Sequence, residues 1–403
     1  MAEKLERPDG VFTRRQFLYI AGGTVAVTAA GTVLAACGAS ATTAPTAAPT
    51  AAPTAAPSAA PTAGAVGGDF NLFTWAGYDG TGVPAMEKFY ADNNIKLNVK
   101  YISNEVLENF LKAPGAELWD ATSDNQGDTE YAYTSGISSE ITVDEVPALA
   151  KMYPFFKDSE FWKIRDGVYN SVPWTFGPIG INTRKDKLPD GIPTYEALFD
   201  PKLKGRIGTY DDALNMVSTA AVATGNDPHF LTREQLNGPI KDWLMKLQPQ
   251  IKVASTSIAD QANLLISGDV DVELVGLLWN VLSAKAQGND TLDFVVPKEG
   301  TFGFVDGVVI TPWAKSRANA LAYVNALMEG VTAVAMNESV NQLSPNPAVT
   351  NALKADVRNL YPADIEEYIN KTLKWNKFWY DPAGKYATVE EWRKVWDEVK
   401  ASG

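Results

Sequence analysis

The chain has 403 residues and a formal net charge of −13, with one histidine and one cysteine. This length is enough for two or more domains with a large core, and the negative balance argues against nucleic acid, because phosphate binding needs a basic face. With only His229 and Cys37 available, zinc sites built from several such ligands are excluded, and we expect no metal ion and no cofactor.

Residues 1–36 have the pattern of an export signal. Arg14 and Arg15 stand before a long run without charged residues, and such a pair matches the twin-arginine signal. The run ends Leu-Ala-Ala-Cys37, which resembles the lipobox of bacterial lipoproteins, where the chain is cut before the cysteine and a lipid is attached to its thiol. We predict cleavage and lipidation at Cys37. A retained transmembrane anchor is the alternative, because about 20 apolar residues can span a bilayer.

Residues 37–68 form a low-complexity segment in which proline returns at every fourth position of a Pro-Thr-Ala-Ala repeat. Such a composition cannot bury enough apolar surface to fold. We therefore expect a disordered spacer between the lipidated Cys37 and the globular part of the chain.

Strand and helix patterns alternate after the spacer. In chain order they predict a strand over 69–74, a helix from Pro84, a strand over 96–102, a helix over 104–112, a short strand over 119–122 and a polar loop over 123–130. This alternation favours a mostly parallel sheet with helices on both faces, in which ligands bind at the carboxyl ends of the strands. Trp75 and Tyr78 follow the first strand, so they are candidate ligand positions.

A strand over 173–182 is predicted to cross into a second lobe. Further along the chain the patterns predict strands over 206–210, 293–297 and 307–312, a β-rich run over 269–279, and helices beginning near 211 and over 239–247, 316–328 and from Thr388, which forms a capping box with Glu391. Asp212 falls in the first turn of one of these helices, where a carboxylate is favoured by the helix dipole and could act only as a cap.

Several motifs carry a resemblance that covers nearly all of 69–400. They are Phe-Thr-Trp75-Ala-Gly-Tyr78, Ser171-Val-Pro-Trp-Thr-Phe-Gly, Tyr195-Glu-Ala-Leu-Phe-Asp-Pro-Lys-Leu-Lys-Gly, Tyr210-Asp-Asp212-Ala, Leu-Trp279-Asn and Lys298-Glu-Gly with a downstream Asp306. Their order resembles the spermidine/putrescine-binding branch of the solute-binding proteins of bacterial ABC importers.

The resemblance implies an α/β class with the two-lobed type II periplasmic-binding-protein fold, two doubly wound sheets joined by crossing hinge strands that close on a ligand. We assign residues 69–174 and 304–345 to lobe I and residues 175–303 and 346–403 to lobe II. The chain would be a monomer outside the cytoplasm, held to the membrane by its lipid, that delivers a small cationic amine to the permease.

The resemblance also implies a site between the lobes. Trp75, Tyr78, Trp279 and Phe304 would stack on the amine, and Asp212 and Asp306 would accept its ammonium groups. The chain departs from the family at three further site positions, where Asn215 replaces a second acid, Asn125-Gln-Gly replaces a Ser-x-Tyr, and Gln342 replaces a tyrosine.

Two questions stay open at this level. Asp124 or Asp128 could turn inward and restore a third acid, although we expect the acidic stretch 120–130 to be a solvated loop rather than a calcium site. The ligand could also be a sugar, an amino acid or another amine.

A carboxylate-dependent hydrolase is the second class of function, but no nucleophile–histidine pair or phosphate-binding loop is apparent, and we predict no enzyme.

Overall fold

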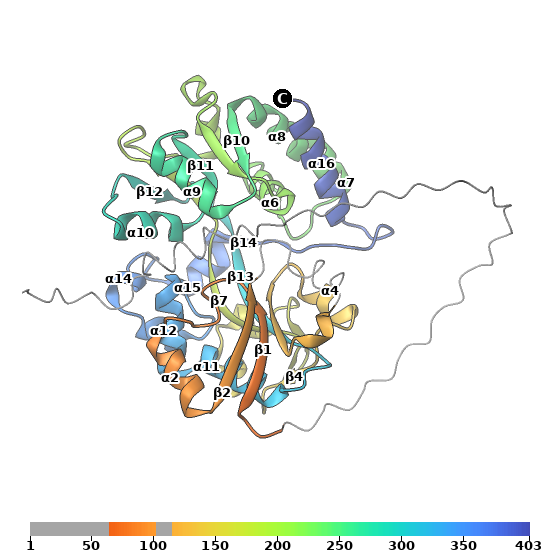
Figure 1. The fold of residues 1–403 in the computed structure, drawn as a ribbon. Coiled ribbons are helices and arrows are strands. Elements are labelled where there is room, and N and C mark those ends of the chain that lie inside the picture. The colour runs from red at the N-terminus through yellow and green to blue at the C-terminus, as the bar shows by residue number, and fades with distance from the viewer. Residues whose placement is uncertain (1–63, 102–114) are drawn as a thin grey trace, which may run out of the picture.

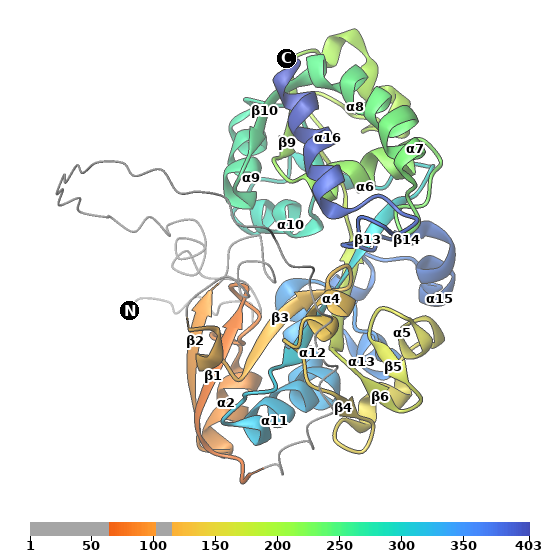
Figure 2. The same cartoon turned by 90° about the vertical axis from the view of Figure 1, so that its right-hand side faces the viewer.

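The computed structural model describes residues 64–101 and 115–403, which form two α/β lobes (Figures 1 and 2). The export signal, Cys37, most of the spacer and the predicted helix over 104–112 lie outside the described residues. Within the described part of the chain, no helix is long and apolar enough to cross a membrane. The two-lobed α/β prediction is confirmed.

Lobe I, the lower lobe in Figure 1, is built on a six-stranded sheet. Its strands are β2 (Ile95–Tyr101), β1 (Gly68–Thr74), β3 (Ala121–Asn125), β13 (Thr301–Ile310), β7 (Val172–Pro178) and β14 (Leu373–Trp375). β1 pairs in parallel with β2 and β3, whereas β13 is antiparallel to both β3 and β7. The carboxyl ends of β1 and β3 therefore share one edge of the sheet.

The helices of lobe I cover this sheet, and a small second sheet lies beside it. The helices are α2 (Pro84–Asp92), α4 (Thr129–Thr134), α5 (Pro154–Asp158), α11 (Arg317–Met328), α12 (Gly330–Val340), α13 (Pro347–Ala352), α14 (Ala355–Arg358) and α15 (Ile365–Glu367). The small sheet joins β4 (Ile141–Thr142), β6 (Val168–Tyr169) and β5 (Lys163–Arg165).

Lobe II has a five-stranded sheet in the order β10-β9-β11-β8-β12. These strands are β10 (Ile251–Ser255), β9 (Ile207–Tyr210), β11 (Val272–Gly276), β8 (Gly180–Arg184) and β12 (Leu292–Val295). Its helices are α6 (Ala213–Ala223), α7 (Arg233–Gln235), α8 (Lys241–Leu247), α9 (Ile258–Ser267), α10 (Leu278–Ala286) and α16 (Val389–Ala401). The predicted capping box of Thr388 with Glu391 is present at the start of α16.

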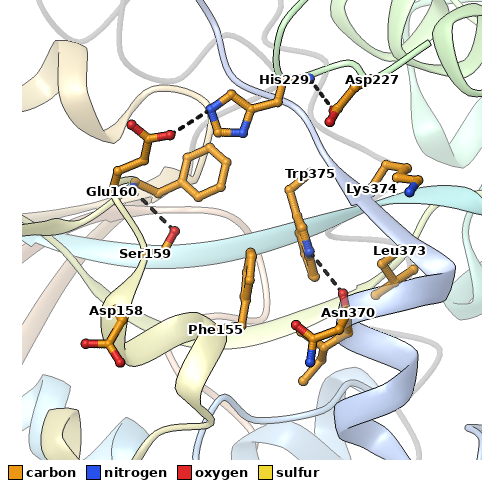
Figure 3. Close-up of a pocket in the computed structure, with 12 residues that line it drawn as sticks. Phe155, Asp158, Ser159, Glu160, Asp227, His229, Asn370, Leu373, Lys374 and Trp375 are labelled. Atoms are coloured by element: carbon orange, nitrogen blue, oxygen red, sulfur yellow. Dashed lines mark hydrogen bonds and ion pairs between the residues drawn. The ribbon is translucent and has the colours of Figure 1, made fainter.

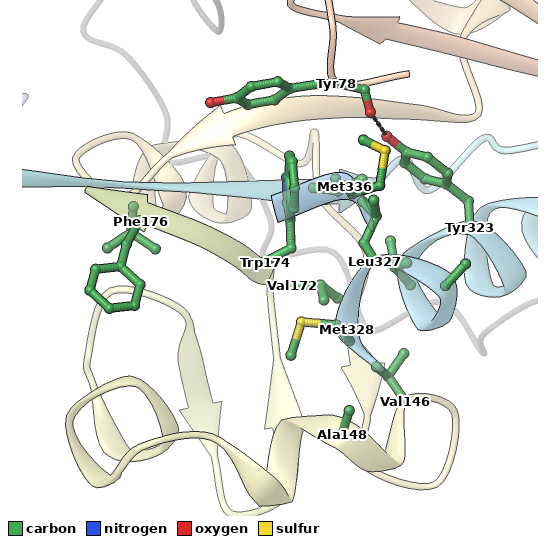
Figure 4. Close-up of a cluster of buried hydrophobic side chains, with 14 of the residues drawn as sticks. Tyr78, Val146, Ala148, Val172, Trp174, Phe176, Tyr323, Leu327, Met328 and Met336 are labelled. Atoms are coloured by element: carbon green, nitrogen blue, oxygen red, sulfur yellow. Dashed lines mark hydrogen bonds between the residues drawn. The ribbon is translucent and has the colours of Figure 1, made fainter. Parts of the chain in front are cut away.

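The core of lobe I supports the turn that carries Tyr78. Trp174 on β7 lies beside Leu327 on α11 and Met336 on α12, as Figure 4 shows, and Phe176 on β7 belongs to the same core. The Tyr323 hydroxyl donates a 2.6 Å hydrogen bond to the backbone carbonyl of Tyr78. The turn that carries Tyr78 is thus fixed to α11.

Three local predictions are wrong in their boundaries. The strand predicted over 119–122 runs over Ala121–Asn125, so the first part of the predicted 123–130 loop is strand and its last residues begin α4. β13 begins at Thr301 and ends at Ile310, so it starts well before the strand predicted over 307–312. The β-rich run over 269–279 contains only the strand Val272–Gly276, and α10 begins at Leu278.

The lobe boundaries also need correction. Residues of 353–375, among them Leu353, Tyr368 and Trp375, pack into the core of lobe I, and β14 joins its sheet, so assigning all of 346–403 to lobe II is wrong. β7 stays in the first sheet as far as Pro178, so the crossing falls near Ile179 rather than after 174. The predicted crossing strand over 173–182 is real but is split into β7 and β8.

Candidate functional site

A buried carboxylate, Asp306, lies at the centre of the predicted site in lobe I. Its Oδ2 accepts a 2.6 Å hydrogen bond from the Tyr78 hydroxyl and its Oδ1 accepts a 3.0 Å bond from Asn125 Nδ2. Only 8% of Asp306 is exposed. Among the described residues, no cationic side chain bonds to this carboxylate, so its two partners are neutral.

Strand register explains why these three residues meet. Asn125 is the last residue of β3 and lies directly opposite Asp306 on β13. Tyr78 comes from the turn after β1, the strand beside β3. Because side chains alternate along a strand, Asp306 and Phe304 lie on the same face of the sheet. Asp124, the residue before Asn125 on β3, points to the other face. The prediction that Tyr78, Asn125 and Asp306 belong together is supported by this geometry.

Aromatic rings surround the Tyr78 end of this cluster. The ring of Tyr78 packs edge-on against Trp75, with centroids 5.6 Å apart, and against Trp174, at 4.9 Å. Trp75 is half-buried and Trp174 is fully buried. Trp75 is therefore the ring that remains available to a ligand, and Trp174 supports Tyr78 from the core.

Gln342 and Phe304 complete the lobe I side. Gln342 Oε1 accepts a 2.8 Å bond from the Thr175 hydroxyl and lies 3.5 Å from the Tyr78 hydroxyl. Phe304 lies opposite Gly177 in the register of β13 and β7, and a side chain on Gly177 would come within about 3.0 Å of the Phe304 ring. Glycine at 177 leaves the space that this ring occupies.

Burial changes the acidity of the cluster. Desolvation raises the pKa of Asp306 to about 6, opposed by the hydrogen bonds from Tyr78 and Asn125. Burial and the nearby Asp306 carboxylate raise the pKa of Tyr78 well above its usual value, so its hydroxyl keeps its proton. Asp306 is thus a carboxylate that would gain free energy from a cationic partner.

The lobe II side of the predicted site is centred on Asp212. It is the N-cap of α6, and its Oδ1 accepts hydrogen bonds from the backbone N–H of Asn215 at 2.8 Å and from Asn215 Nδ2 at 3.1 Å. Burial raises the pKa of Asp212, while these bonds and the charge of Arg393 on α16 oppose the rise. Asp212 therefore caps α6, as its position in the sequence allowed. Asn215, which stands where the family has a second acid, is a hydrogen-bond donor to Asp212.

Trp279 is half-buried in the first turn of α10, not at the end of a strand. Its neighbour Leu278 packs against the core of lobe I, which places this turn at the junction of the lobes. Between described residues, no hydrogen bond, ion pair or ring contact joins Asp212, Asn215 or Trp279 to the Asp306 cluster. The predicted site residues thus form two groups, one on each lobe, with Asp306 as the buried acid of the lobe I group.

The acidic stretch 120–130 is not the solvated loop that the sequence predicted. Asp120 and Asp124 are buried, and Asp120 accepts bonds from the backbone N–H groups of Asn71 and Ser316. Asp124 accepts a 2.8 Å bond from Ser171 on the face of the sheet opposite Asp306, and burial raises its pKa well above the usual value. Asp128 accepts a 2.5 Å bond from the Tyr380 hydroxyl.

A pocket of about 510 Å3 lies elsewhere, where Glu160 and Phe155 of lobe I face His229 and Trp375 (Figure 3). It contains none of the predicted site residues. Two of its three acids lie near lysines: Glu160 lies 3.5 Å from Lys377 and Asp158 lies 3.0 Å from Lys163. The third, Asp227, accepts a 3.0 Å hydrogen bond from the backbone N–H of His229. This pocket is therefore a less suitable cation site than the Asp306 cluster.

Three residues around the site escaped prediction. Thr175 and Trp174 support Gln342 and Tyr78, and both stand in the Ser171-Val-Pro-Trp-Thr-Phe-Gly motif, which could have drawn attention to them. Arg393 acts on Asp212 from the last helix, and no local pattern connects positions so far apart in the sequence.

Residues 84–363 match a family model described as bacterial extracellular solute-binding protein. Among relatives in sequence, the spermidine/putrescine-binding periplasmic protein 1 of Haemophilus influenzae is 26% identical over 337 residues, covering 82% of this chain and 88% of that protein. The putrescine-binding periplasmic protein PotF of Escherichia coli is 26% identical over 345 residues, covering 81% of this chain and 90% of that protein.

Solved structures show the same fold. The TpPotD lipoprotein of Treponema pallidum superposes with a TM-score of 0.67 at 17% identity, covering 83% of this chain and all of that one. The spermidine/putrescine ABC transporter substrate-binding protein PotD of Streptococcus pneumoniae gives a TM-score of 0.66 at 16% identity, covering 83% and 98%.

Proposed function

The chain belongs to the family of bacterial extracellular solute-binding proteins, and from that premise we propose that it captures a small cationic amine of the putrescine or spermidine kind between its lobes. It would then deliver the amine to the membrane subunits of an ABC importer. The relatives named above bind such amines according to their names. Capture without catalysis is part of the proposal.

One observation carries the choice of a cation. Asp306 is a buried carboxylate with two neutral hydrogen-bond partners, a half-buried Trp75 close by and no cationic partner among the described residues. An ammonium group bonded to such a carboxylate gains about 1.5–3 kcal/mol, and a ring face adds about 0.5–2 kcal/mol. A neutral sugar would gain less from both groups.

A thermal-shift screen tests the ligand class. Small amines should raise the melting temperature of the protein, whereas neutral sugars and amino acids at the same concentration should not. Stabilisation by a sugar alone would replace the proposal with a binding protein for another solute.

Anchoring and assembly complete the proposal. The protein would be cleaved before Cys37, carry lipid on that residue and work as a lipid-anchored monomer outside the cytoplasm, in the periplasm or on the outer face of the cell membrane. The export signal at Arg14 and Arg15 and the lipobox support this. Lobe I begins at Gly68, so the spacer of 37–68 would separate the lipid from the sheet that carries Asp306.

Amine affinity should fall as the pH drops through about 6. The carboxyl of Asp306 has a raised pKa of about 6 in the free protein, and an ammonium group prefers the ionised form. Below this pH, binding must release a proton, which costs up to about tenfold in affinity per pH unit, while the amine itself stays protonated. Calorimetric titration at about pH 5 and pH 7.5 measures this. An affinity equal at the two pH values would contradict the role given to Asp306.

Putrescine should bind at least as tightly as spermidine. Each ammonium group taken from water needs an acceptor, and the proposal assigns this role to Asp306 on one lobe and Asp212 on the other. Asp124 faces the opposite side of its sheet and Asp128 is bonded to Tyr380, so neither supplies a third acid here. In paired titrations, a spermidine affinity about tenfold higher, a difference of about 1.4 kcal/mol, would contradict this prediction.

A further inference from the structure

A second buried carboxyl group, Glu273 on β11, lies beneath the turn that carries Trp279. It is fully buried, and its two oxygens accept hydrogen bonds from two amides, a 2.7 Å bond from Asn280 Nδ2 on α10 and a 3.0 Å bond from Asn182 Nδ2 on β8. Asn182 Nδ2 also donates a 3.1 Å bond to the carbonyl of Leu277, the residue before α10. This triad connects the sheet of lobe II with the first turn of α10.

The backbone between Glu273 and Trp279 is unusually constrained. Val275 has a φ of 61°, a conformation that is rare for a β-branched residue and is found where surrounding structure enforces it. At Gly276 a side chain would collide with Asn182, so the chain passes directly over this amide. The N-cap of α10, Leu277, supplies no side-chain hydrogen bond. The start of α10 therefore depends on the Glu273 triad.

We propose that Glu273 is a positioning residue for Trp279 and that its protonation rearranges the hydrogen bonds that hold the first turn of α10. This inference rests on the proposed function, because Trp279 is a wall of the ligand site only there. The geometry that carries it is the triad itself and its direct connection to the residue beside Trp279.

The rearrangement follows from the chemistry of the three groups. An ionised carboxylate can only accept hydrogen bonds, and both amides donate to it. A protonated carboxyl must place its hydrogen on an acceptor, and the buried Oδ1 atoms of Asn182 and Asn280 have no hydrogen-bond partner. Rotating the Asn280 amide by a half-turn presents that oxygen to Glu273. Rotating Asn182 would also break its bond to Leu277, so the change falls on α10.

The surroundings leave Glu273 sensitive to pH. Burial raises its pKa to about 7, opposed only by the two amides. Arg184 on β8 pairs with Asp186, and Arg206 beside β9 pairs with Asp271 beside β11. α9 and α10 contribute Asp260, in the first turn of α9, and Lys285, in the last turn of α10, and both are exposed. Between described residues, no ion pair joins any of these groups to Glu273. Protonation of Glu273 near neutral pH therefore changes the hydrogen bonds of the first turn of α10.

The test uses the ligand-free protein labelled with 5-fluorotryptophan. The chain has 11 tryptophans, and Trp279→Phe identifies the 19F resonance of Trp279. That resonance should shift as the pH passes through about 7. It should stop shifting in Glu273→Gln and, if that variant fails to fold, in Asn280→Ala, which removes the connection from the helix side. Asp124→Asn, a buried acid in the other lobe, should leave the titration unchanged.

Two outcomes separate this inference from the proposed function. In calorimetry, wild-type amine affinity should fall about twofold to tenfold below neutral pH, beyond the Asp306 effect, and Glu273→Gln should lose this step. If amines bind but the Trp279 resonance does not titrate, the inference is wrong and the function stands. If the resonance titrates but no amine binds, the triad acts as described and the function is wrong.

Discussion

Asp306→Asn should weaken the binding of putrescine by about 2–5 kcal/mol, the scale for losing one partner of a desolvated ion pair. The substitution keeps the shape of the side chain and removes only its charge. Tyr78 and Asn125 would still have an amide to bond with, so the geometry of these three side chains should persist. Calorimetric titration of the variant and the wild type at about pH 7.5 gives the difference directly.

The same variant should fold normally. A carboxyl with a raised folded-state pKa binds a proton more tightly in the folded than in the unfolded protein, so its contribution to stability is lost as the pH rises through about 6. At neutral pH the charge of Asp306 thus opposes folding, and a neutral asparagine should not lower the melting temperature. Asp124→Asn, on the opposite face of the same sheet, is the matched control and should retain full affinity. Equal losses in both variants would show a general effect on lobe I.

Cys37→Ala should leave the protein without lipid. Each methylene of an acyl chain contributes about 0.8 kcal/mol to membrane binding, and two chains anchor a protein stably where one does not. Without the thiol no lipid can be attached, so any membrane attachment of this variant would come from the uncut apolar run before residue 37. Replacing Arg14 and Arg15 with lysine should instead leave unprocessed precursor in the cytoplasm.

Labelling with a radioactive fatty acid checks the anchor. The wild type should take up label, and Cys37→Ala should take up none. Wild-type protein without label would contradict lipidation and favour the retained anchor helix. Neither variant touches the described lobes, so amine affinity should be the same in all three proteins.

Periodicity predicted the alternating strands and helices, and the resemblance to solute-binding proteins implied the two lobes; the site residues that it implied stay a prediction. Trp75 and Tyr78 lie just after β1, at the carboxyl end of a parallel strand, where ligands bind in such sheets. Asp306 lies beside Asn125 because the two residues are directly opposite each other on β13 and β3. The face of the sheet to which Asp124 points depends on the register of β3 and β13, because a shift of one residue moves a side chain to the other face. This register could not be predicted from the sequence, because the predicted strand ended at residue 122 and did not include Asp124.

Long-range packing explains the remaining errors. Residues 346–375 return to lobe I because β14 adds to β13, a pairing between segments some seventy residues apart that no local pattern specifies. The role of Asp212 as an N-cap was visible from its position, but the approach of Arg393 was not. Glu273 lies within the β-rich run predicted over 269–279, and nothing in that run marked it as special. Its amide partners come from two other elements, β8 and α10.

Calorimetric titration of the protein with putrescine tests the central claim most directly. We predict one binding site of roughly micromolar affinity or tighter, about −8 kcal/mol, that is weakened by Asp306→Asn and retained by Asp124→Asn. No heat of binding from putrescine or spermidine to a folded protein, together with binding of a neutral sugar or an amino acid, would contradict the claim that this chain is an amine-binding protein.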